Sequence, residues 1–182
     1  MKNKLKRSEP EAGKKLLGML NFELRDHDPE TRSFTAVASD DSIDRYGTII
    51  NQDGWELGHF LNNPVIPWGH DYGKPPVATS LETGVINGKL TIKPGFATVE
   101  ELSSNPDDPS EWAKFVDTIY KLYTHPKRFL RAFSVGFIPK AWHWDKTEDD
   151  GAVLIYDACE LLENFHQLVL GDADAGVPDL DG

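Results

Sequence analysis

Cysteine is almost absent from this sequence, which contains only Cys159 among its 182 residues. A single cysteine cannot form an intramolecular disulfide, so the chain is not built for an oxidising compartment. Long apolar runs are absent too: no stretch approaches the roughly 20 apolar residues of a membrane-spanning helix, and the charged N-terminus lacks the apolar core of a signal peptide. We therefore expect a protein that works in a cytoplasm, without a membrane partner.

The sequence also lacks the motifs that hold metals and phosphates. It contains no H-E-x-x-H motif, no pair of cysteines and no glycine-rich phosphate loop. Its 19 basic and 30 acidic residues give a formal net charge of -11, whereas a nucleic-acid-binding protein needs a basic face that neutralises phosphates. We expect no metal, no cofactor and no nucleic-acid partner.

The charges that are present are distributed unevenly. Six of the first fifteen residues are lysine or arginine, and acidic residues are frequent from Asp149 onward. Solvated, mobile ends are the usual explanation of such segments. We expect a flexible basic segment at residues 1–16, one folded domain at residues 17–176 and an acidic tail at residues 177–182.

Short alternating apolar segments predict a fold that is mainly β. One convincing helix is expected at residues 110–123, where Ser110 can cap the first turn and large apolar residues recur at helical spacing. A brief helix or turn is expected within residues 55–63. We predict an α+β fold, in which a mainly antiparallel β barrel or sandwich carries flanking helices. The predicted strands include residues 19–24 and 33–39, and a hairpin that turns at Asn87-Gly88.

Ser134 is the one small hydroxyl in the apolar segment LRAFSVGFIP, residues 130–139. The piece AFSVG is one residue away from the G-x-S-x-G elbow of α/β-hydrolases, but that elbow requires a helix after the serine, and here the sequence continues as a strand. A serine becomes a nucleophile when a neighbouring base removes its proton, and histidine is the usual base. Among the histidines, His70 stands apart because an apolar, strand-like run leads directly to it. The other histidines are His27, His59, His125, His143 and His166.

Four segments stand out by their order and spacing: DRYGTII (44–50), NPVIPWGHD (63–71), LRAFSVGFIP (130–139) and ELLE (160–163), the last followed by LVLGDADAG. Together they resemble the prohead (procapsid) maturation proteases of tailed bacteriophages, over about residues 18–176. The resemblance implies a fold related to that of the herpesvirus assembly proteases. It also implies a serine endopeptidase that enters the immature capsid in the host cytoplasm. There the enzyme would cleave scaffold protein or the N-terminal extension of the major capsid protein, and often itself.

The resemblance also implies roles for particular residues. Ser134 matches the nucleophile, His70 matches the general base, and Glu160 best fits the acidic third member. Glu163 and Asp157 stay open as alternatives, because residue spacing alone does not choose among the three acids. Strand periodicity predicts that Asp157 and Glu163 share one face and that Glu160 points to the other.

One departure from the family pattern adds a further candidate. After ELLE the family commonly has an apolar residue and a serine, whereas this sequence has Asn164, Phe165 and His166. His166 would then replace or supplement the acid, as a second histidine does in the herpesvirus enzymes. Next to His70, we expect Asp71 to support the loop rather than to contact the imidazole.

Two other functions are compatible with the same residues. The first is a catalytically silent capsid-assembly or scaffold-binding domain of the same fold. The second is a hydrolase of small esters, which would need a closed apolar pocket instead of an extended groove for a peptide. The sequence also leaves a homo-oligomer open.

Overall fold

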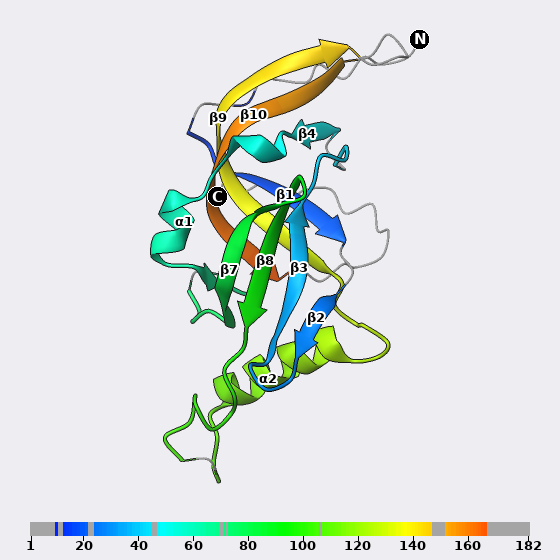
Figure 1. Ribbon diagram of the computed structural model, residues 1–182. Coiled ribbons are helices and arrows are strands. Elements are labelled where there is room, and N and C mark those ends of the chain that lie inside the picture. Colours follow the sequence, from blue (N-terminus) through cyan, green and yellow to red (C-terminus); the bar gives the residue numbers. More distant parts are fainter. Residues whose placement is uncertain are drawn as a thin grey trace, which may run out of the picture.

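The computed structural model describes residue 10 and residues 13–21, 24–44, 47–69, 71, 73–105, 107–146 and 152–166. Within these residues the chain forms two β-sheets and two α-helices, which confirms the prediction of a mainly β fold (Figure 1). No helix in the described part is long and apolar enough to cross a membrane.

The first sheet is built around two long strands that pair with each other along their whole length. These are β9 (Ala132–Lys146) and β10 (Ala152–His166), which are antiparallel. The sheet is mainly antiparallel, as predicted, but two short strands run parallel to β10. The sheet has the order β1-β9-β10-β4, with β5 also on β10, and its other strands are β1 (Leu16–Asn21), β4 (Thr48–Ile50) and β5 (Trp55–Glu56).

The second sheet is antiparallel throughout and has the order β2-β3-β8-β7-β6. The hairpin predicted at Asn87-Gly88 joins β7 to β8, and both turn residues have positive φ angles, 51° and 70°. Its strands are β2 (Arg25–Asp28), β3 (Ser33–Ser39), β6 (Val65–Ile66), β7 (Ala78–Ile86) and β8 (Lys89–Gly95).

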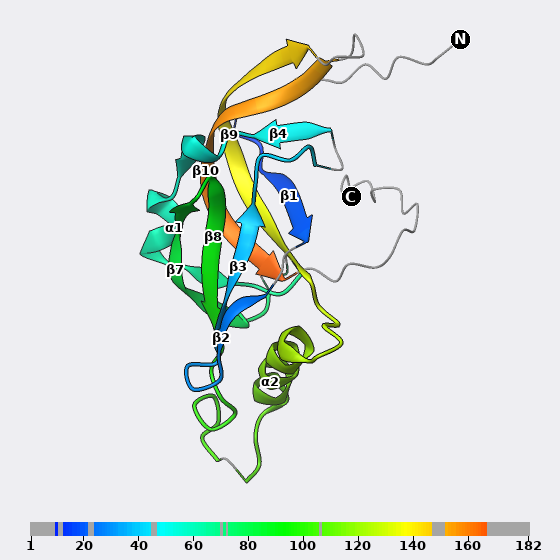
Figure 2. The ribbon, with the colours of Figure 1, turned by 45° about the vertical axis from the view of Figure 1, so that its right-hand side comes forward.

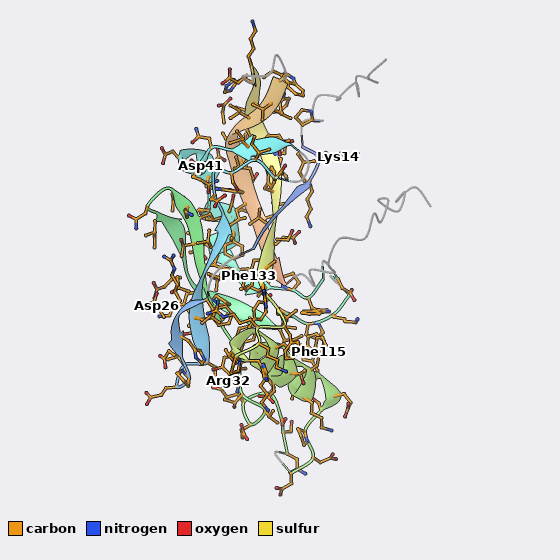
Figure 3. The ribbon with its side chains drawn as sticks, turned by 90° about the vertical axis from the view of Figure 1, so that its right-hand side faces the viewer. Lys14, Asp26, Arg32, Asp41, Phe115 and Phe133 are labelled. Carbon is orange, nitrogen blue, oxygen red and sulfur yellow. The ribbon has the colours of Figure 1, made fainter. Side chains whose placement is uncertain are left out.

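The two sheets pack against each other over one hydrophobic core (Figure 2). Strand alternation directs Phe133, Val135 and Phe137 of β9 into this core, where Phe133 meets Phe34 of β3. Figure 3 shows Phe133 between the sheets, with the ribbon of α2 below it. The core therefore lies on one face of β9, and the residues between these aromatics belong to the opposite face.

Two helices cover the edges of this arrangement. The main helix, α2 (Glu111–Thr124), begins where it was predicted: the hydroxyl of Ser110 accepts a hydrogen bond from the Ala113 N–H at 3.1 Å. It packs on β9 through Tyr123, whose ring stacks on Phe133 with the centroids 5.2 Å apart and whose hydroxyl donates to the Ala132 carbonyl. The predicted brief helix is α1 (Gly58–Asn62), preceded by a 3-10 turn at Gln52–Gly54.

Candidate functional site

Ser134 lies on the central strand of the first sheet. The backbone of β9 pairs with β1 on one side and β10 on the other, so Ser134 has Met19 and Phe165 as its cross-strand neighbours. It points away from the aromatic core, because Phe133 and Val135 on either side of it point inward. Ser134 is nevertheless only 1% exposed. The position is therefore enclosed on a face of the sheet that does not belong to the main core.

Glu163 is the acidic candidate nearest to Ser134. It pairs across the strands with Gly136, two residues along β9 from Ser134, which corresponds to roughly 7 Å of strand. Alternation puts Ser134 and Gly136 on the same face, and directly paired residues share a face, so Glu163 lies on the Ser134 side of the sheet. Glu163 is also buried, which is unusual for a glutamate and requires a partner.

The predicted separation of Glu160 and Glu163 onto opposite faces is wrong. Glu160 pairs with Ile138 and Glu163 pairs with Gly136, so both acids face the Ser134 side. The reason is a β-bulge at Leu162, where β10 has one residue more than β9 between these two pairs. Strict period-two alternation does not hold across such an insertion.

Glu160 and Asp157 are both further from Ser134 and are engaged elsewhere. Glu160 is opposite a residue four positions from Ser134, roughly 13 Å along the strand, and its carboxylate pairs with Lys140. The hydrogen bond from Lys140 holds the pKa of Glu160 below its usual range. Asp157 lies in a second irregularity of β10, roughly 25 Å along the strand, and binds His143 with Oδ2 2.7 Å from Nδ1.

His70, the predicted base, lies outside the described residues, and so does the side chain of His166. The residues beside His70 are described. Trp68 packs edge-on against Phe115 of α2, and the Asp71 N–H donates to the Trp68 carbonyl at 3.0 Å. Gly69 between them has a φ of +59°, a left-handed conformation that favours glycine. The segment that leads to His70 is thus anchored on α2 and ends in a tight turn.

Asp71 acts within this loop. Its Oδ1 accepts a hydrogen bond from the Gly73 N–H at 2.9 Å, and its Oδ2 lies 3.1 Å from Lys74 Nζ. The hydrogen bonds from Lys74 and then Gly73 lower the pKa of the Asp71 carboxyl. These contacts agree with the loop-supporting role expected from the sequence.

The histidines whose side chains are described make contacts with other groups. His27 Nε2 lies 2.8 Å from the hydroxyl of Tyr120, and His125 Nδ1 accepts from the Lys127 N–H after α2. His143, roughly 30 Å along β9 from Ser134, is the partner of Asp157. His59 belongs to α1 and lies near Glu160, whose pKa its charge helps to lower. None of these contacts resembles a base held next to the Ser134 hydroxyl.

Lys15 is the residue of this site that the sequence did not reveal. It lies just before β1 and pairs with Glu163, although residues 1–16 were expected not to pack. Burial lowers the pKa of the Lys15 ammonium to about 8. In the sequence, Lys15 belongs to a basic segment without hydrophobic periodicity. Only the pairing of β1 with β9 brings Lys15 close to Glu163. The one sequence signal nearby is Gly136, a glycine inside a strand, which often marks a close approach by another group.

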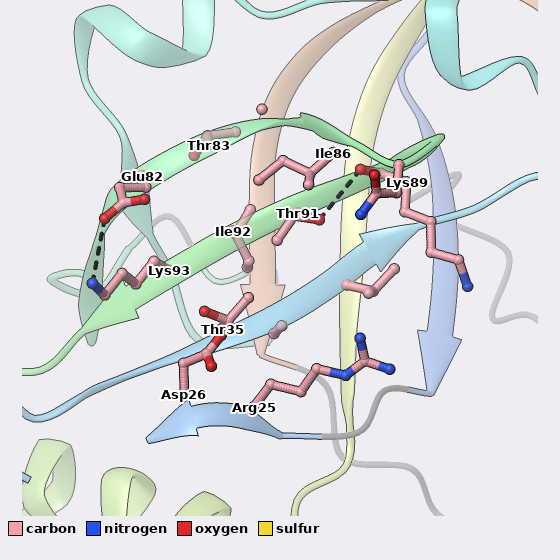
Figure 4. A pocket seen from close by; sticks show the side chains of 14 residues that line it. Arg25, Asp26, Thr35, Glu82, Thr83, Ile86, Lys89, Thr91, Ile92 and Lys93 are labelled. Atoms are coloured by element: carbon pink, nitrogen blue, oxygen red, sulfur yellow. Dashed lines mark hydrogen bonds and ion pairs between the residues drawn. The ribbon is translucent and has the colours of Figure 1, made fainter. Parts of the chain in front are cut away.

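A separate groove of about 540 Å³ lies on the outer face of the second sheet (Figure 4). Its floor is made of residues such as Thr35 and Thr91, which alternate with the core residues of β3 and β8. Because Ser134 faces outward from the first sheet, the groove and Ser134 lie on opposite outer faces of the two packed sheets. The charged side chains at the groove are Arg25, Asp26, Glu82, Lys89 and Lys93.

Other kinds of chemistry find little support in the part of the chain that the structure describes. It contains no group of three or more histidine, cysteine, aspartate or glutamate side chains placed to hold a metal ion. Cys159 is fully buried, and burial raises the pKa of its thiol to about 12, which makes it a poor nucleophile. Comparisons with family models, curated proteins and solved structures found no match to this chain.

Proposed function

We propose that this chain is a serine endopeptidase of bacteriophage prohead maturation, with Ser134 as its nucleophile. The observation that carries the proposal is the placement of Ser134 and Glu163. They lie on one face of two paired strands, one alternation step apart, and Glu163 is a buried carboxylate. The sequence resemblance to the prohead proteases identifies the same strand and the same acidic segment.

In this proposal His70 removes the proton of Ser134 as Oγ attacks the scissile carbonyl carbon, and the carbonyl oxygen becomes an oxyanion. When the intermediate collapses, the C–N bond breaks and His70 gives the proton to the leaving amine. Water then hydrolyses the acyl-serine by the same proton route. The acid binds the imidazole, fixes its tautomer and stabilises the imidazolium that forms.

We assign the third role to Glu163 in preference to Glu160, which the sequence resemblance favoured. Both acids face the Ser134 side, but Glu163 is nearer by two strand positions and is more deeply buried. Glu160 is held by Lys140 and Asp157 by His143. His166 stays a candidate for supplementing the acid, since its backbone lies at the end of β10.

The proposed substrates are the scaffold protein and the N-terminal extension of the major capsid protein, and the chain itself where its own segments reach the site. The proposed fold is the β barrel with surrounding helices of the herpesvirus assembly proteases, and the two packed sheets with two helices support it. The burial of Ser134 fits an enzyme that is slow until the prohead has assembled, because a substrate carbonyl reaches Oγ only after covering groups move.

The test is co-expression of the chain with the scaffold or major capsid protein of its phage. We expect cleavage products with the wild type and none with Ser134→Ala or His70→Ala. Ser80→Ala is a matched control, because Ser80 is also a buried serine in a strand but belongs to the second sheet. Products that persist with Ser134→Ala would show that Ser134 is not the nucleophile.

One observation favours a second function, a silent capsid-assembly domain: Ser134 is only 1% exposed, as expected of a structural serine. In that case the chain would enter proheads and bind scaffold, and none of the three alanine substitutions would change any cleavage pattern. The co-expression experiment therefore separates the two functions directly.

A further inference from the structure

Lys15 and Glu163 form an ion pair that crosses the central strand of the site. Lys15 precedes β1, Glu163 belongs to β10, and β9 runs between them. By register, Leu17 of β1 and Glu163 of β10 are the two cross-strand neighbours of Gly136. The pair thus joins the two strands that flank β9, above Gly136, which is the next position after Ser134 on the same face.

Gly136 is what makes room for this pair. A Cβ atom built on Gly136 would lie 2.5 Å from Glu163 Oε1 and 2.6 Å from Lys15 Cε. Both distances are far below a normal contact, so the space that a side chain would take is filled by the lysine and the glutamate. The absence of a side chain at Gly136 is therefore a requirement of the ion pair.

The glutamate needs its cation. The side chain of Glu163 is only 9% exposed, and a buried carboxylate without a partner is strongly disfavoured as an anion. A carboxylate has two oxygens with several lone pairs, so the contact of Lys15 with Oε1 is compatible with a second hydrogen-bond donor on the same group. The Lys15 ammonium at Oε1 can hold the carboxylate ionised, while the other oxygen of Glu163 orients an imidazole.

A second pair on the same face provides an internal comparison. Lys140 of β9 and Glu160 of β10 form this pair, and Glu160 lies two strand positions further from Ser134 than Glu163 does. Their side chains are more exposed, 42% and 22%, against 29% and 9% for Lys15 and Glu163. The two pairs have the same chemistry, but only the Lys15 pair contains a buried carboxylate and lies adjacent to Ser134.

We propose that Lys15 is a positioning residue of the Ser134 site, which holds Glu163 ionised and fixed above Gly136 so that Glu163 can orient the catalytic base. The inference rests on the proposed function. It adds that β1 is part of the catalytic apparatus, because the strand carries the cation that the acid requires. Lys15 acts through Glu163 and does not contact the substrate.

The experiment compares Lys15→Met, Lys15→Arg and Lys140→Met in the full chain. Methionine keeps an apolar stem of similar length and removes the charge, whereas arginine keeps the charge. The readouts are kcat and KM on a peptide that contains the scaffold cleavage site, and the rate at which a fluorophosphonate labels Ser134. Circular dichroism and thermal melting verify that each variant is folded.

We expect Lys15→Met to lower kcat and the labelling rate about tenfold to a hundredfold with KM within about twofold, since a displaced orienting group has effects of this size. Lys15→Arg should recover most of the loss, and Lys140→Met should behave as the wild type. A merely structural role would reduce the folded fraction without changing the kcat of the molecules that remain folded.

The outcomes separate the inference from the proposed function. If the wild type is labelled at Ser134 and Lys15→Met is labelled equally fast with an unchanged kcat, the inference is wrong and the protease proposal stands. If Lys140→Met causes the loss and Lys15→Met does not, Glu160 is the orienting acid and the inference is again wrong. If the wild type neither cleaves nor is labelled, both proposals are overturned.

Discussion

At the scale of single residues, the site depends on a position without a side chain. Gly136 lies two residues after Ser134, and the space above its Cα holds the carboxylate of Glu163 and the stem of Lys15. A glycine inside a strand lowers stability, so its presence here is explained by the group that occupies its space.

We predict that Gly136→Ala is destabilising by about 1 to 3 kcal/mol, because overpacking forces side chains out of their preferred positions. It should also lower kcat for peptide cleavage, since the added methyl group would displace Glu163. Gly84→Ala is the matched control: Gly84 is also inside a strand, but nothing lies within 4 Å of its Cβ position. Chemical denaturation should show that Gly84→Ala is neutral or stabilising by up to about 1 kcal/mol. If Gly136→Ala changes the free energy of unfolding as little as Gly84→Ala does, then Lys15 and Glu163 do not fill the space above Gly136.

A pH profile tests the charge of Lys15. Burial lowers the pKa of Lys15 to about 8, so above that pH the ammonium loses its proton and Glu163 loses its counter-charge. We predict that kcat falls as pH rises through about 8, and that Lys15→Arg moves this limb upward because a guanidinium stays charged. Further along this face Lys140 and Glu160 pair with each other, and Glu56 of β5 is a cross-strand neighbour of Glu160. His59 of α1 lies close enough to Glu160 to help lower the pKa of that carboxyl.

Loss of folding would not explain such a limb. Between pH 8 and 10.5 the unfolded chain keeps a proton on Lys15 that the folded chain has released, so this group makes the free energy of unfolding rise with pH. An alkaline limb that is identical in wild type and Lys15→Arg would rule out Lys15 as its source.

At the scale of elements, the sequence predicted the features that depend on residues close together in the chain. The helix cap at Ser110 and the turn at Asn87-Gly88 depend on residues that are close in the chain, and both are present. The bulge at Leu162 depends on how β10 aligns with β9, which no local pattern shows. For that reason the sequence placed Glu160 and Glu163 on opposite faces, and the choice of acid stayed open.

The 3-10 turn before β5 supports β10 through a second close approach. A Cβ atom on Gly54 would lie 1.9 Å from the carbonyl oxygen of Asp157, so the turn packs directly on the backbone of β10. The Asn51 N–H also donates to the Tyr156 carbonyl at 2.9 Å. This segment therefore holds the irregular part of β10 in place.

We predict that Gly54→Ala destabilises the protein by about 2 kcal/mol or more, because the clash is with backbone atoms that cannot rotate away. Gly58→Ala is the control, since Gly58 begins α1 with nothing within 4 Å of its Cβ position. Alanine there should be neutral or stabilising by up to about 1 kcal/mol. Urea unfolding of both variants is the measurement, and equal midpoints for the two would disprove the close packing.

At the scale of the whole molecule, the two packed sheets have different outer faces. The first sheet presents Ser134 and the Lys15–Glu163 pair, and the second presents the groove between β2 and β7. Hydrophobic alternation predicted the mainly β fold, because burial of apolar residues determines it. It did not predict the place of Lys15, since β1 reaches β9 only through pairing over more than a hundred residues of sequence.

The central claim is that Ser134 is an activated nucleophile, and intact mass spectrometry after treatment with a fluorophosphonate tests it most directly. The account predicts a single adduct on the wild type, mapped by peptide analysis to Ser134, and no adduct on Ser134→Ala or His70→Ala. Treatment in the presence of assembled scaffold should give the same adduct faster. An adduct that persists on Ser134→Ala, or a wild type that stays unlabelled while it cleaves its capsid substrate, would contradict the account.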